Sequence, residues 1–378
     1  MDLPVVECSW RAYRRASHKQ VELMKDIEAR APRWGQEQRL NLNQVPLPGP
    51  FAEQYLEGVI GPIPGLEQIV LRVSSTMTAY SAYRRTKIVY RLNDHLAEGL
   101  LEAKWPGNYP LDQLRLPRNG MVIELPSRIM ENIATINGSL LDLSPENIDL
   151  GLSTYKSWNH FICYYDFDLI QDRDGTTHPR LFIRIGRLGI PGNEEVYAAG
   201  KFALHGFDTL DESWLDFITR TDELWTRLGS ESPSEQNITP GVDDRLPLFR
   251  LLLNAILYIH GSEDVVAIVH PGLKPTKSAK NPDRTRRFQD LAVPRTFEVG
   301  SRYGAIVERW ELEEGNDLCI QSKGNGSTVR PHIRAAHSHL YWTGPGRELA
   351  RVRFLPPIKV KGGVEDIEAP VVVVKRVR

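Results

Sequence analysis

Residues 160–170 read HFICYYDFDLI, and this run of aromatic and β-branched side chains decides the fold class. Such a composition is typical of a β-strand. The turn residues 172–175 (DRDG) follow, and residues 180–185 (RLFIRI) have the alternating pattern of a second strand. With residues 196–204 as a third strand, the middle of the chain is predicted to be β-rich.

Helical patterns lie on both sides of these strands. Residues 9–31 place apolar side chains on one side of a helix, which is expected to end at Pro32. Residues 86–104 repeat apolar side chains at helical spacing. The tetrad 209–212 (TLDE) predicts a capping box, and residues 246–260 predict an apolar helix. The chain is therefore expected to have an α+β fold whose N-terminal part is helical.

Changes in composition predict three parts. Residues 1–262 are expected to form a larger acidic α+β body, residues 263–296 a basic flexible linker, and residues 297–378 a small, basic, β-rich C-terminal domain. The basic residues of the linker are Lys274, Lys277, Lys280, Arg284, Arg286 and Arg287.

The charge of the chain is unevenly distributed. Residues 271–378 hold 20 Lys and Arg against 12 Asp and Glu, a net charge of +8, although the whole chain has a net charge of −1. A basic C-terminal part suggests contact with a polyanion. Mutual attraction between the acidic and basic parts of the chain is the alternative.

The sequence predicts a cytoplasmic protein without a membrane partner. The three cysteines have no paired spacing, which argues against a disulfide framework and fits a reducing compartment. The N-terminus lacks the pattern of a signal peptide, and no apolar run has the roughly 18 residues that a membrane span needs. No cofactor and no metal site is expected.

Residues 330–342 (RPHIRAAHSHLYW) are the stretch most informative about function. They contain three of the ten histidines, together with two arginines and two aromatic residues. On an extended strand, His337, His339 and Tyr341 would project from one face, with about 7 Å between neighbours. Imidazole groups beside guanidinium groups are the side chains that binding or cutting a phosphodiester requires.

Three functional interpretations and one structural interpretation of this stretch stay open. His337 and His339 are candidate catalytic residues, because imidazoles titrate near neutral pH and can act as acid and base. The stretch can instead bind RNA through phosphate contacts and base stacking. The candidate binding residues, beyond those of the linker, are Arg330, His332, Arg334, Tyr341, Trp342, Arg347, Arg351 and Arg353. A metal site is weakly supported, and a polar face packed against the acidic body is the structural alternative.

The C-terminal third resembles a known family of plasmids and phages. The residues that carry the resemblance are 297–305 (FEVGSRYGA), 330–345 (RPHIRAAHSHLYWTGP) and 353–358 (RFLPPI). They are similar to the type V-A anti-CRISPR family whose members lower the CRISPR effector nuclease through its messenger RNA during translation. The resemblance implies an anti-defence protein whose partners are RNA or ribosome-bound mRNA and the nascent effector polypeptide.

Two other functions remain compatible with the residues. One is a metal-independent RNase that uses His337 and His339. The other is a non-catalytic nucleic-acid-binding protein of a mobile element, whose affinity would fall steeply with salt because phosphate contacts release counterions.

Overall fold

The structure is a computed structural model, and it describes most of residues 4–360. Within that range, the residues outside the description are 41, 43–44, 46, 62–66, 104–105, 117–119, 130–157, 168–177, 188–195, 228–246, 263, 269–293, 318–331, 335–336 and 356–357. The predicted linker basic residues, Arg330 and the end of the chain after residue 360 therefore lie outside the described residues.

The described residues form helices and strands that alternate along the chain. The helices are α1 (Val5–Ala16), α2 (His18–Glu37), α3 (Gly49–Ile60), α4 (Glu67–Thr86), α5 (Asp94–Glu102), α8 (Leu210–Arg227), α9 (Pro247–Gly261) and α11 (Ser301–Asp317). The strands are β1 (Ile88–Leu92), β2 (Gly120–Glu124), β3 (Trp158–Phe167), β4 (Pro179–Arg187), β5 (Val196–Phe202), β6 (Val265–Ile268), β7 (Arg295–Val299), β8 (His332–Arg334), β9 (His337–Thr343), β10 (Leu349–Leu355) and β11 (Ile358–Val360).

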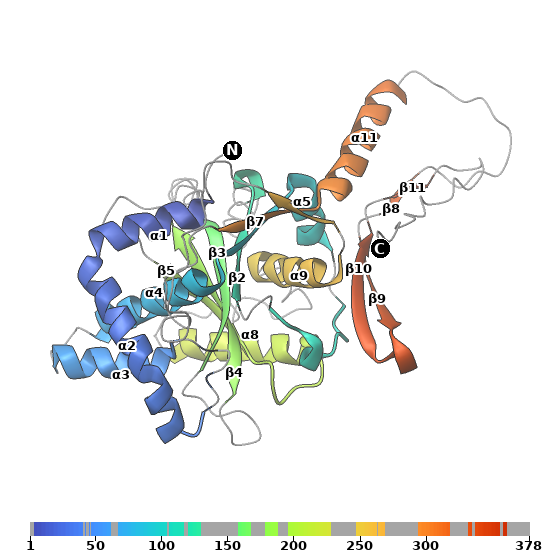
Figure 1. Cartoon of the computed structure of the whole chain (residues 1–378). Coiled ribbons are helices and arrows are strands. Elements are labelled where there is room, and N and C mark those ends of the chain that lie inside the picture. Colours follow the sequence, from blue (N-terminus) through green and yellow to red (C-terminus); the bar gives the residue numbers. More distant parts are fainter. Residues whose placement is uncertain are drawn as a thin grey trace, which may run out of the picture.

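Seven strands form one mixed sheet in the order β5-β4-β3-β2-β1-β7-β6. Strand β1 runs parallel to both of its neighbours, β2 and β7, whereas the other neighbouring pairs are antiparallel. Helices α1–α4 lie on one side of the sheet and α5, α8 and α9 on the other (Figure 1). The predicted α+β class is confirmed, with a helical N-terminal part and a small two-stranded sheet near the C-terminus.

Side chains of the central strands alternate between two cores. In β2, Val122 packs with the N-terminal helices, while Met121 and Ile123 pack on the side of α5 and α9. In β3, Ile162 and Phe161 divide in the same way. Successive residues of a strand point to opposite faces. Because both faces are covered by helices, these strands are apolar at nearly every position.

The expected helix over residues 86–104 is wrong in its first half, where β1 lies. Ile88, Val89 and Leu92 are buried in the sheet, and the helix begins only after Asn93. The Asn93 side chain accepts hydrogen bonds from the backbone N–H groups of His95 and Leu96, so it caps α5. A strand buried on both faces has a continuous apolar run, which periodicity alone does not separate from a helix.

The expected helix end at Pro32 is also wrong. The chain instead breaks at Ser17, and α2 continues through Pro32 to Glu37. Proline inside a helix costs about 3 kcal/mol. Burial of the α2 face that includes Met24 and Ile27 offsets this cost.

Other local predictions are confirmed. Strands β3, β4 and β5 and helices α8 and α9 occupy the expected positions. At the start of α8, the hydroxyl of Thr209 accepts from the backbone N–H of Glu212. The Glu212 carboxylate in turn accepts from the backbone N–H of Asp208, as expected for a capping arrangement.

Strand β7 crosses the position at which the C-terminal part was expected to begin. It pairs with β1 over five residues, from Arg295 opposite Ile88 to Val299 opposite Leu92. Strand β6, from the start of the expected linker, pairs with β7 at the edge of the same sheet. Within the described residues, no helix is both long enough and apolar enough to cross a membrane.

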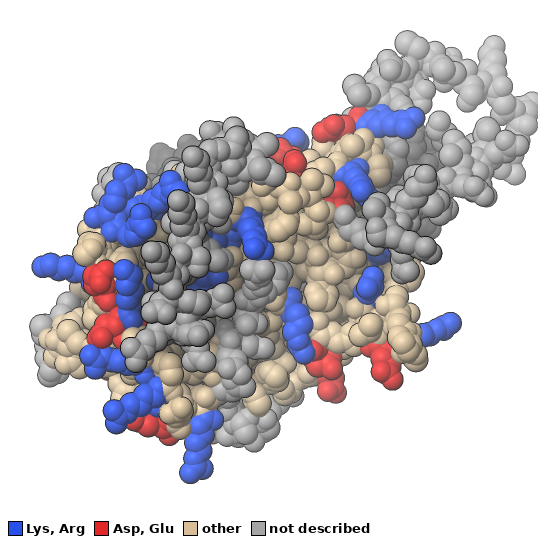
Figure 2. Space-filling view, viewed as in Figure 1, with Lys and Arg blue, Asp and Glu red and all other residues tan. Residues whose placement is uncertain are grey.

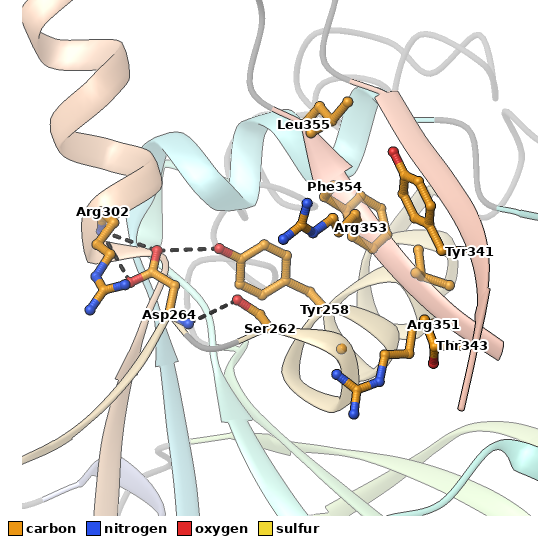
Figure 3. Close-up of a pocket in the computed structure, with 12 residues that line it drawn as sticks. Tyr258, Ser262, Asp264, Arg302, Tyr341, Thr343, Arg351, Arg353, Phe354 and Leu355 are labelled. Carbon is orange, nitrogen blue, oxygen red and sulfur yellow. Dashed lines mark hydrogen bonds between the residues drawn. The ribbon is translucent and has the colours of Figure 1, made fainter. Parts of the chain in front are cut away.

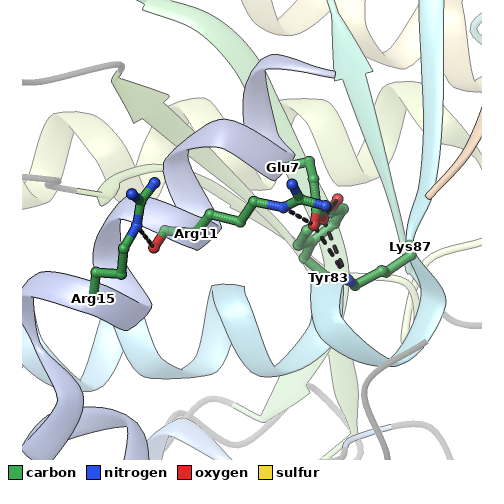
Figure 4. A network of polar contacts seen from close by, with 5 residues as sticks. All are labelled: Glu7, Arg11, Arg15, Tyr83 and Lys87. Atoms are coloured by element: carbon green, nitrogen blue, oxygen red, sulfur yellow. Dashed lines mark hydrogen bonds and ion pairs between the residues drawn. The ribbon is translucent and has the colours of Figure 1, made fainter. Parts of the chain in front are cut away.

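A buried polar network joins α1 to the end of α4. The Glu7 carboxylate accepts from the hydroxyl of Tyr83 at 2.7 Å and from Nε of Arg11 at 2.9 Å, and it pairs with Nζ of Lys87 at 3.3 Å (Figure 4). Arg15 donates to the backbone oxygen of Arg11, one helical turn earlier. Burial and the charge of Glu7 raise the pKa of Tyr83, so the phenol stays protonated and donates.

A buried carboxylate fixes the start of α3 on the sheet. Oδ1 of Asp166 accepts from the backbone N–H of Gly49 at 2.9 Å and from its neighbour Phe167 at 2.8 Å. Burial raises the pKa of Asp166 to about 7, although the two N–H donors act in the opposite direction. The raised pKa means that ionisation of Asp166 destabilises the folded state.

We predict that Asp166→Asn changes the pH dependence of stability. The folded pKa of about 7 lies above the unfolded value near 3.9. The wild type should therefore lose up to about 4 kcal/mol of unfolding free energy as pH rises from about 4 to about 7. The asparagine keeps the acceptor oxygen but cannot ionise, so this loss should disappear. Urea unfolding at several pH values measures it, and identical pH profiles for both proteins would contradict the prediction.

Candidate functional site

The candidate site lies on the hairpin of β9 and β10. The strands are antiparallel, with His339 opposite Arg353 and Tyr341 opposite Arg351. Opposite residues in such a pair share a face, as do alternate residues along one strand. His337, His339, Tyr341 and the two arginines therefore lie on one face, which the sequence pattern predicted for the two histidines and Tyr341.

The ring contacts along β9 confirm this row. The centroids of the His337 and His339 rings are 5.1 Å apart in an edge-on arrangement, and those of His339 and Tyr341 are 5.9 Å apart. His337 is half-buried, whereas His339 and Tyr341 are exposed. His339 and Tyr341 can therefore be reached by a ligand from solvent.

The geometry of the histidine pair bears on its chemistry. In a displacement at phosphorus, the attacking and leaving oxygens lie roughly in line on opposite sides of the phosphorus atom. His337 and His339 approach from the same face of one strand, beside Arg353. This arrangement favours contact with a phosphate group over acid–base work from both of its sides.

The opposite face of the hairpin packs on the body. Val352 is 3% exposed, and the ring of Phe354 lies 5.9 Å from that of Tyr258 in α9. At Gly261, the last residue of α9, an added Cβ would come within 2.4 Å of the backbone oxygen of Val352. The absence of a side chain at Gly261 therefore allows α9 and β10 to approach closely.

Gln113 holds the end of the hairpin through both atoms of its amide. Its Nε2 donates to the backbone oxygen of Glu348 at 2.8 Å, and its Oε1 accepts from the backbone N–H of Ala350 at 2.7 Å. Gln113 belongs to a short 3-10 turn of the body (Leu111–Gln113). The hairpin thus has a fixed position relative to the sheet.

The remaining candidate residues are more scattered. Trp342 is exposed but projects from the opposite face to Tyr341, across from Ala350. Arg347 is exposed in the turn between the strands, with a φ of 57°. The backbone of His332 and Arg334 lies in β8, which pairs with β11 rather than with β10. The histidine-rich stretch of residues 330–342 thus contributes to two strands, β8 and β9.

The surface of the hairpin is mixed, with exposed arginines beside exposed Tyr341, Trp342 and Leu349. Figure 2 shows basic side chains over α1 and α2 and more widely separated ones toward the hairpin. Among the described residues, no group of three His, Cys, Asp or Glu side chains lies close enough to hold a metal ion.

His260, which the sequence pattern did not single out, lies near Arg351 of the hairpin. Burial lowers the pKa of His260, at the end of α9, and the nearby charges of Arg351 and Arg115 lower it further. The sequence contained no signal for this proximity, because His260 and Arg351 belong to elements that meet only in the folded chain.

Comparisons with known proteins bear on the identity of the chain. A family model described as AcrVA2-like, the anti-CRISPR type V subtype A2 family, matches residues 90–362. A solved structure described as the crystal structure of AcrVA2 is similar over 95% of this chain and 100% of that chain, with a TM-score of 0.56 and 17% sequence identity. That structural likeness shows the fold alone. No curated protein matches the chain.

We predict that Gly261→Ala loosens the hairpin. The added Cβ has to displace the backbone of Val352, and overpacking of this kind costs about 1–3 kcal/mol. Hydrogen exchange of the β9 and β10 amides should accelerate. The matched control is Gly58→Ala in α3, where an added Cβ meets nothing within 4 Å. This control should be stabilised by about 0.5–1 kcal/mol. Equal exchange rates in the hairpin of the Gly261 variant and the wild type would refute the prediction.

Proposed function

The chain belongs to the AcrVA2-like family of type V subtype A2 anti-CRISPR proteins, and we propose that it lowers the amount of a type V effector nuclease by acting on the effector mRNA during translation. In this proposal the hairpin contacts the RNA or the ribosome-bound message. The body over residues 1–262 recognises the emerging effector polypeptide, as the family resemblance implies. The proposal assigns RNA contact to the hairpin and leaves cleavage to another nuclease.

The observation that carries the proposal is the exposed face of β9 and β10. It presents Arg351 and Arg353 beside His339 and Tyr341 while the opposite face packs on α9. Guanidinium groups bind phosphate with two parallel hydrogen bonds. Tyrosine rings stack on unpaired bases, with a contribution of about 1–3 kcal/mol per base. The face therefore combines the two kinds of group that hold single-stranded RNA.

The position of this face supports the same function. A two-stranded hairpin alone is marginally stable in water. Here, the side chain of Gln113 forms two hydrogen bonds with the backbone of the hairpin, and Phe354 packs against Tyr258 of α9. These contacts hold the hairpin against the body. The arginines and rings are thereby held in one arrangement, which reduces the conformational entropy lost on binding.

We predict that His337→Ala/His339→Ala weakens silencing while the protein stays folded. When the wild type is co-expressed with a type V effector, effector mRNA and effector protein should both fall. The double variant should lower both less, because it loses two polar groups from the face that meets RNA. A matched control is His18→Ala, at an exposed position on α2. Equal silencing by the double variant and the wild type would show that silencing does not need these two histidines.

The alternative is a metal-independent RNase that would use His337 and His339, whose rings are in contact. Purified protein should then cleave RNA in the presence of EDTA, and the double variant should not. Intact RNA at high protein excess would exclude this alternative and leave binding without cleavage. A non-catalytic nucleic-acid-binding protein of a mobile element would bind RNA without lowering the effector.

We also predict that silencing follows the effector polypeptide rather than the nucleotide sequence of its message. Synonymous recoding of the effector gene changes the mRNA and keeps the nascent chain, so the fall in effector mRNA should persist. A frameshift near the start codon, which keeps almost all of the RNA sequence, should abolish it. Loss of silencing after synonymous recoding would contradict recognition of the nascent chain.

A further inference from the structure

A cavity of about 480 Å³ lies where the hairpin meets the body. It is formed by the end of α9, the start of α11 and the strands β9 and β10 (Figure 3). Residues from all of these elements line it, including Tyr258, Arg302, Tyr341, Arg351 and Arg353. Its size is within the range of pockets that hold small organic ligands.

The cavity carries an excess of positive charge. Among the residues that the structure describes, three arginines line it (Arg302, Arg351 and Arg353) and one carboxylate (Asp264), a net charge of +2. All three arginines are exposed, and none forms an ion pair with a residue that the structure describes. Because this lining has more positive than negative charge, it attracts an anion.

Asp264 offsets only one of these three positive charges, and its carboxylate caps α11. It accepts from the backbone N–H groups of Arg302 and Tyr303, each at 3.1 Å, and from the hydroxyl of Tyr258 at 3.2 Å (Figure 3). The partial positive charge at the start of α11 is therefore already matched by Asp264. Arg302 lies on the α11 side of the cavity and Arg351 and Arg353 on the hairpin side (Figure 3), and the lining keeps its excess of positive charge.

The positive charge of the cavity also affects the neighbouring side chain of His260. The pKa of His260, one residue before Gly261 in α9, is lowered first by burial and then by the positive charges of Arg351 and Arg115. The end of α9 next to the cavity is thus a region of positive potential, which attracts anions.

We propose that this cavity binds one nucleotide of single-stranded RNA, with its phosphate among Arg302, Arg351 and Arg353 and its base against the ring of Tyr341. The inference rests on the proposed RNA contact of the hairpin and identifies the position of that contact. A carboxylate is satisfied by a single bidentate arginine, whereas the oxygens of a phosphate accept from several guanidinium groups at once. Three arginines beside an exposed aromatic ring therefore fit a nucleotide better than an acidic peptide.

The test uses the full-length protein and Arg302→Ala. Arg302 lies on α11, outside the hairpin face, so this variant probes the cavity and leaves the row of β9 unchanged. Fluorescence anisotropy with labelled single-stranded oligoadenylate should show affinity about tenfold weaker for the variant. The slope of log affinity against log salt should fall by about 0.7, as expected for one lost phosphate contact. Arg353→Ala should have the same effect.

The control is Arg309→Ala, at an exposed position later on the same helix, which should bind as the wild type does. Competition distinguishes the sources of phosphate: adenosine monophosphate should displace the oligoadenylate more strongly than inorganic phosphate. A short acidic peptide should not compete. Equal affinity of Arg302→Ala and the wild type, or stronger competition by the acidic peptide, would overturn the assignment.

The same variants separate this inference from the proposed function. If the wild type lowers effector mRNA but Arg302→Ala binds oligoadenylate normally, the cavity assignment is wrong and the proposed function stands. If Arg302→Ala and Arg353→Ala lose oligoadenylate binding but the wild type does not lower effector mRNA, the cavity assignment stands and the proposed function is wrong.

Discussion

The parallel pairing of β7 with β1 attaches the C-terminal elements to the central sheet. It joins residues 207 positions apart, since Arg295 lies opposite Ile88. The pairing continues beyond the strands, because the backbone N–H of Asn93 donates to the oxygen of Val299 at 2.9 Å. Forming it closes a very long loop, which costs conformational entropy before any contact stabilises it. Burial of Tyr90 against Phe297 helps to offset that cost.

Once β7 is in the sheet, the positions of the following elements are determined. Gly300 has a φ of 85° and turns the chain directly from β7 into α11, where an added Cβ would lie 2.3 Å from the Leu96 side chain. Asp264, just before β6, caps the same helix. The pairing of β6 with β7 thus brings Asp264 to the start of α11, and the cavity of arginines forms beside this junction.

Local patterns predicted the features that depend on neighbours in sequence. The alternation in β9 correctly indicates the shared face of His339 and Tyr341, and Thr209 correctly marks the start of α8. Features that depend on distant pairing were not predictable in this way. The apolar run of β1 matches a helix as well as a strand, and it is a strand because β2 and β7 cover both of its edges. Arg302 carries no local signal at all, since its neighbours in the cavity come from α9 and β10.

The hairpin cannot be treated as an independent functional unit. Its two strands pair only with each other within the described part of the chain, and the face with Ala350 and Val352 would be exposed if the body were removed. The cavity would also be lost, because Tyr258 and Arg302 come from elements of the body. A two-stranded hairpin with one apolar face is only marginally stable unless that face packs on the body. A ligand that bound these arginines would therefore also stabilise the folded body.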